Sequence, residues 1–193
     1  SLEAVEKLTK EVRQAVMSYF APQIEERGKL RADKIKFRRF KNAVQMAQKA
    51  DQILRAARVK PKALPLKLGV PIFEYASLEE DEDLANKWAG LLASALMGDH
   101  VLAAYPKILA ELTPAEARML DSVNRWHAQG PVDLDTWKAK GYTAETLFKQ
   151  ERLTEEQFRV CAQNLIRLGL WKTGDPILWD ALGDSLKEFQ FTY

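Results

Sequence analysis

The sequence is poor in the residues on which most catalytic and metal sites depend. Its 193 residues include one cysteine, Cys161, and two histidines, His100 and His127. A single cysteine excludes an intramolecular disulfide, and these three residues cannot supply the four ligands of a structural zinc site. Neither histidine lies in a recognisable motif, so we expect both at surface or helix-capping positions. Cys161 lies on an apolar helical face, which predicts a buried thiol in a reducing compartment.

Long apolar runs and glycine-rich nucleotide motifs are also missing. The most apolar stretch, residues 64–75, is interrupted by Lys67, Gly69, Pro71 and Glu74. It is therefore far shorter than the roughly 20 apolar residues of a spanning helix. No P-loop and no GxGxxG motif occurs. We predict a cytoplasmic protein with no cofactor, no metal and no catalytic residues, although a site built from scattered carboxylates stays open. Because the chain begins with Ser1, an upstream targeting segment also stays open.

What the chain does have is strongly segregated charge behind a net charge of +2. Residues 27–62 hold thirteen Lys or Arg and two acids, whereas residues 74–121 hold ten acids and three bases. Such patches either neutralise one another, within one chain or between subunits, or face separate partners.

Helical periodicity dominates the first half of the chain. Residues 2–26 predict an amphipathic helix that Pro22 ends or kinks, and residues 28–58 predict a longer one, with Phe37 and Phe40 as core anchors. The short break between them predicts a long antiparallel helix pair. Lys60 begins a linker rich in Lys and Pro, and a short helix is expected near residues 104–111.

The most informative stretch is residues 65–96. The apolar side chains at its start, between Leu66 and Tyr75, are expected to be buried away from solvent. Pro65 and Pro71 limit where regular structure can begin. Ser77 then predicts a helix start, because Glu80 three residues later can complete a capping box. The acids at 79–83 would lie at the positive end of this helix, where negative charge is favourable. Apolar residues beyond it cover more than one face, which predicts a buried central helix.

A second unit is predicted to begin at Thr113, so we expect a helical domain over residues 1–112 and a second domain over residues 113–193. Thr113 and Thr154 each start a strong capping motif, and Gly169 predicts the end of the second of these helices. Short apolar pieces at 132–134, 170–173 and 177–179 predict a strand or turn and a β-hairpin, followed by a last helix at 184–189. The expected fold class is mainly α, with a small winged-helix-like unit and its short β-hairpin after the helical half.

Three segments carry a family resemblance. They are PLKL at 65–68, PIFEYASLEEDEDLANKWAGLLASA at 71–95 and YPKILAELTPAEARMLD at 105–121. With these residues the sequence resembles the Abi-alpha family, a mostly bacterial domain of unknown function. The resemblance implies a part in abortive infection, which is defence against phage by arrest or death of the infected cell. It implies no enzymatic motif.

Two functional hypotheses stay open. The first is a non-enzymatic interaction protein that acts through a protein partner or by self-association. The second is a nucleic-acid-binding protein that uses the winged helix or a basic stripe, because helical spacing places several cations along one face. The stripe consists of Arg27, Arg31, Lys34, Arg38 and Lys41, with Arg39 nearby. A solvated face, or one paired with the acidic segment, explains the same residues. Glu155 and Glu156 argue against DNA docking by the winged helix.

Overall fold

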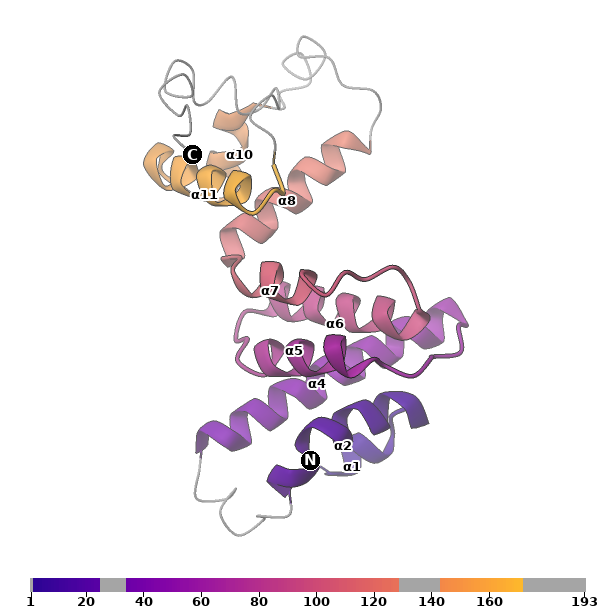
Figure 1. Cartoon of the computed structure of the whole chain (residues 1–193). Helices are drawn as coiled ribbons and strands as arrows, with labels where there is room; N and C mark the ends of the chain where they lie inside the picture. Colours follow the sequence, from indigo (N-terminus) through magenta and orange to yellow (C-terminus); the bar gives the residue numbers. More distant parts are fainter. Residues whose placement is uncertain (1, 25–33, 129–142, 172–193) are drawn as a thin grey trace. The chain divides into compact units, whose positions relative to one another are not determined.

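The computed structural model describes residues 2–24, 34–128 and 143–171, and their regular structure is helical throughout (Figure 1). The expected mainly α fold class is therefore confirmed. Two compact units, Ser1–Leu112 and Thr113–Tyr193, divide the chain, and each is described by itself. The described helices of the first unit are α1 (Leu2–Glu6), α2 (Lys10–Ile24), α4 (Lys34–Ala57), α5 (Leu66–Ala76), α6 (Glu82–Met97) and α7 (Tyr105–Ala110). Those of the second are α8 (Pro114–His127), α10 (Ala144–Gln150) and α11 (Glu155–Arg167).

Helices α2 and α4 pack as an antiparallel pair, which confirms the predicted arrangement. Thr9, before the start of α2, bonds to Asp51 late in α4, whereas Phe20 near the end of α2 meets Phe40 near the start of α4. The expectation of one helix over residues 2–26 is wrong in one respect, because the chain breaks at residues 7–9 into α1 and α2. Pro22 lies within α2 and does not end it before Ile24.

A buried carboxylate on α4 fixes this break. Asp51 is only 4% exposed. One of its oxygens accepts from the backbone N–H of Thr9 at 3.2 Å, and the other accepts from Arg55 Nε at 2.8 Å. Arg55 also donates to the carbonyl of Lys7 at 3.1 Å. Because charged hydrogen bonds are stronger than neutral ones, Asp51 and Arg55 hold the turn against α4.

The core of the first unit is built around α4 and α6. Small buried side chains recur on both helices, at Ala43, Ala47 and Ala50 of α4 and at Ala89 and Ala93 of α6. Such residues let two helix axes approach closely. Trp88 of α6 is 1% exposed and stacks on Tyr75 of α5, with 6.4 Å between ring centres. The prediction of a buried central helix is confirmed.

The start of that helix was predicted at the wrong residue. Ser77 is the C-cap of α5, and its hydroxyl donates to the carbonyl of Glu74 at 2.8 Å. Asp81 is the N-cap of α6, where its side chain accepts from the N–H of Leu84 at 3.0 Å. The carboxylate of Glu79 accepts from the next two backbone N–H groups and so orders the turn between the helices. Pro71 likewise does not limit the start of structure, because α5 begins at Leu66 and runs through it.

In the second unit both predicted capping boxes are confirmed. Thr113 and Glu116 cap α8 reciprocally, and Thr154 and Gln157 do the same for α11. Gly169 follows α11 with φ of +69°, a conformation that favours glycine, as expected at a helix end. The buried side chains of Phe158, Ala162 and Leu165 form the inner face of α11.

The winged-helix details receive no support from this unit. The described part of it contains three helices and no strand. Leu170 and Trp171, at the expected start of the hairpin, form bends. The rest of the expected hairpin, the piece at 132–134 and the last helix at 184–189 lie outside the described residues.

We predict that Asp51→Ala lowers the free energy of unfolding by about 2 kcal/mol, because it removes charge-assisted hydrogen bonds from a buried site. Asp51→Asn keeps an acceptor and should cost clearly less. Urea unfolding followed by circular dichroism measures both. Equal stability of Asp51→Ala and wild type would show that the turn does not depend on this carboxylate.

Candidate functional site

The basic stripe predicted from the sequence is only partly brought together in the structure. Lys34, Arg38, Arg39 and Lys41 lie near the start of α4, whereas Arg27 and Arg31 fall outside the described residues. Lys34 and Lys41 are exposed. Phe37, expected in the core, is 58% exposed, so this expectation is wrong; Phe40 does pack in the core, against Phe20. Although Phe37 and Phe40 lie only three positions apart on α4, only Phe40 packs against the core.

Arg39 serves mainly to join helices. Its Nε donates to Ser77 Oγ at 3.0 Å, and its guanidinium also bonds to the Tyr19 side chain. Its Nη2 lies 3.5 Å from the carbonyl of Glu74. These contacts link α4 to the C-terminal end of α5 and to α2. Arg39 is thus turned inward and half-buried, and it is a poor candidate for binding phosphate.

The acidic segment lies against the basic one within the same unit. Arg38 pairs with Glu80, and the two side chains are 64% and 66% exposed. Lys49 donates to Asn86 at 2.7 Å and lies 3.8 Å from Glu82. Of the arrangements left open by the charge pattern, neutralisation within one chain is therefore present, at least for these pairs.

Hydrogen bonds to backbone carbonyls also hold the acidic segment against α4. Asn42 on α4 donates to the carbonyls of Ser77 and Glu79, at 3.2 and 2.8 Å. The turn between α5 and α6, which we call the acidic turn because it carries Glu79, Glu80 and Asp81, is thereby held against α4. Glu79 and Asp81 could suggest a cation site, but Glu79 accepts from backbone N–H groups of the turn and Asp81 caps α6. The described residues include no cluster of three or more His, Cys, Asp or Glu side chains arranged to hold a metal ion.

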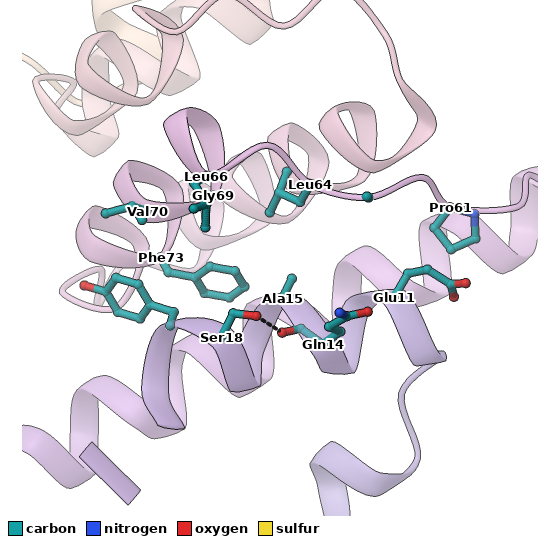
Figure 2. Close-up of a pocket in the computed structure, with 12 residues that line it drawn as sticks. Glu11, Gln14, Ala15, Ser18, Pro61, Leu64, Leu66, Gly69, Val70 and Phe73 are labelled. Carbon is teal, nitrogen blue, oxygen red and sulfur yellow. Dashed lines mark hydrogen bonds between the residues drawn. The ribbon is translucent and has the colours of Figure 1, made fainter. Parts of the chain in front are cut away.

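A different surface was not found by sequence reasoning. A groove of about 530 Å³, which we call the α2–α5 groove, lies between these two helices (Figure 2). One wall comes from α2 and the other from α5, and the linker before α5 contributes further lining residues. Its lining residues are Glu11, Gln14, Ala15, Ser18, Tyr19, Pro61, Ala63, Leu64, Leu66, Gly69, Val70 and Phe73.

The groove has an apolar floor and exposed apolar side chains at its edge. Phe73 is buried beneath it and stacks on Tyr19, with ring centres 5.7 Å apart. At the edge, Leu66 is 73% and Val70 44% exposed. Gly69 lies between them, and a Cβ added there would come within 2.9 Å of Leu64 Cδ2. The absence of a side chain at position 69 therefore lets Leu64 pack close to α5.

Tyr19 keeps its proton at neutral pH. Burial raises the pKa of its hydroxyl, the Glu74 carboxylate adds to this, and Arg39 opposes it. Tyr19 therefore contributes a neutral hydroxyl to the lining of the groove.

Cys161 is half-buried on α11, less enclosed than the sequence predicted. Burial, then the negative charge of Glu116, raises the pKa of its thiol, while a hydrogen bond with Thr113 opposes the shift. Glu116 itself is buried and accepts from Thr113 and from Asn164, at 2.7 and 2.8 Å. A raised thiol pKa leaves little of the nucleophilic thiolate at neutral pH.

The two histidines belong to different units. His100 is exposed in the segment between α6 and α7, as expected, and His127 is the last residue of α8. Over the described ranges, no helix combines the length and the apolar character needed to cross a membrane.

We predict that Cys161 reacts slowly with iodoacetamide and that the pH midpoint of its reaction lies above that of a free thiol. Glu116→Gln should move this midpoint to lower pH, because the charge that disfavours the thiolate is gone while Gln can still serve in a capping box. The alkylation rate between pH 7 and about pH 10 measures the effect on the only thiol present.

Glu156→Gln, an exposed change on the same helix, is the matched control. An unchanged pH profile in Glu116→Gln would contradict the assigned role of this carboxylate.

Residues 37–189 match the model of the Abi_alpha family, whose description is abortive infection alpha. The match covers more than half of the chain and extends from within α4 past the end of α11. It confirms the resemblance drawn from residues 65–121. Neither a curated protein nor a solved structure matched the chain.

Proposed function

Because this chain belongs to the Abi_alpha family, abortive infection alpha, we propose that it takes part in abortive infection as a non-enzymatic interaction protein. It acts in the bacterial cytoplasm, in defence against phage, through contact with a protein partner or with itself.

The α2–α5 groove is the observation that supports this proposal. Leu66 and Val70 are large apolar side chains that stand exposed beside an apolar floor. Burying such side chains gains roughly 1.5–3 kcal/mol each, which makes the site suited to contact with another protein. By contrast, the basic face of α4 is partly occupied by acids of the same unit.

We predict that deleting the gene in its native bacterium raises the number of phage released, because infected cells no longer stop growing before release. The gene encoding Leu66→Glu together with Val70→Glu should fail to restore defence, since both changes put charge where apolar contact is needed. Plaque counts and survival after phage challenge measure the effect.

Leu102→Glu, at another exposed apolar position of the first unit, is the control and should restore defence. Equal plaque counts for the deletion and the parent, across a broad phage panel, would remove the support for a role in abortive infection.

Nucleic-acid binding is the second candidate function, and the exposure of Lys34 and Lys41 on α4 favours it. A winged-helix-like second unit would add a further surface; that arrangement remains a prediction. Of the four cations of the stripe that the structure describes, Arg38 is paired with Glu80 and Arg39 is turned inward, which leaves two, Lys34 and Lys41, exposed for phosphate.

We therefore expect no detectable binding of duplex or single-stranded nucleic acid at low salt, measured by fluorescence anisotropy. Binding that falls steeply with added salt would favour the alternative, since release of counterions makes phosphate contacts salt-dependent. In that case Lys34→Glu with Lys41→Glu should weaken binding more than the exposed control Lys107→Glu.

A further inference from the structure

The walls of the α2–α5 groove are two helix faces of matching length. On α2 the lining residues run from Glu11 to Tyr19, and on α5 they run from Leu66 to Phe73. Lining residues recur at spacings of three and four on both helices, and the two walls extend over eight and seven residue steps. At 1.5 Å per residue each wall is about 11 Å long, or two helical turns. Figure 2 shows the two faces turned toward each other across the groove.

This shape suits a third helix. Two adjacent helices present a furrow into which the side chains of another helix pack in steps of three and four residues. Ala15 and Gly69 keep the floor low, and Phe73 supplies an apolar base. Leu66 and Val70, four positions apart on one wall, match the spacing of apolar residues on an amphipathic helix.

Charge gives the groove a polarity. Among the described residues that line it, Glu11 is the one with a carboxylate side chain, and none is Lys or Arg. Figure 2 shows Glu11 at the end of the groove nearer Pro61. A ligand that fills the apolar floor therefore meets a carboxylate at that end.

We propose that the α2–α5 groove binds one amphipathic helix of a partner protein, with apolar residues at i, i+3 or i+4, and i+7, and a Lys or Arg that pairs with Glu11. This proposal rests on the proposed function as an interaction protein, and it specifies the surface and the kind of partner. The apolar residues of the helix cover Val70 and Leu66, and its cation fixes which way it lies in the groove.

Synthetic helical peptides test the proposal on the purified full chain. The first carries Leu at i, i+4 and i+7 on an otherwise polar helix with Lys at one end; the second has Glu in place of Lys; the third is a scrambled form of the first. Fluorescence anisotropy measures affinity, and amide chemical shifts in NMR locate the site. We expect the Lys peptide to bind best and to shift amides of α2 and α5.

Variants separate the apolar and charged parts of the site. Leu66→Glu or Val70→Glu should abolish binding of the Lys peptide, and Leu102→Glu should not affect it. Glu11→Gln should reduce the preference for the Lys peptide over the Glu peptide by about three- to fivefold, the size expected of a surface ion pair. Thermal unfolding of each variant checks that the fold is kept.

Several outcomes would overturn the proposal. Equal binding of the scrambled peptide would show a non-specific apolar surface, and an unchanged charge preference in Glu11→Gln would exclude the assigned ion pair. Binding of the fluorescent dye anilinonaphthalene sulfonate without peptide binding would indicate a small apolar ligand instead. Self-association in sedimentation that Leu66→Glu abolishes would assign the groove to a second copy of the chain.

The phage challenge described above separates this proposal from the proposed function. If the gene protects cells but the peptides do not bind, the groove assignment alone fails. If the peptides bind as expected but deletion has no effect on phage, the role in abortive infection fails while the binding site stands.

Discussion

The close packing of α4 against α6 is the contact on which the rest of the first unit depends. Helix α4 also contacts α1, α2 and α5, so its position sets theirs. Alanines on both helices make the approach possible, because larger side chains at Ala47 or Ala93 would push the axes apart. The matched charges of Arg38 and Glu80 lie at the edge of this contact and depend on it. They contribute little stability themselves, since both side chains are largely exposed.

Local signals in the sequence predicted the helices well where the capping chemistry is contained within four residues. Thr113 with Glu116 and Thr154 with Gln157 are such cases, and both capping boxes form. Ser77 with Glu80 has the same pattern but lies where α5 ends, so Arg39 and the carbonyl of Glu74 engage the serine hydroxyl instead. A local pattern cannot reveal that competition, because Arg39 is 38 residues away.

The candidate surfaces likewise depend on contacts between distant residues, which a local sequence pattern does not reveal. Helical spacing predicted which cations share a face of α4, but it could not show that Asn42 and Arg38 meet the acidic turn. The α2–α5 groove joins residues about 50 positions apart, and its apolar residues look like ordinary core residues in the sequence. Only the exposure of Leu66 and Val70 distinguishes them, and exposure is a property of the folded chain.

The pairing of Arg38 with Glu80 also affects how far the electric field of these two charges reaches. A cation beside a carboxylate, as in Arg38 with Glu80, acts at a distance as a dipole, whose potential decays more steeply than that of a lone charge. At physiological ionic strength the Debye length is about 8 Å, so little of this field extends beyond the first layers of water. The Arg38–Glu80 pair therefore contributes little to the long-range attraction of charged macromolecules.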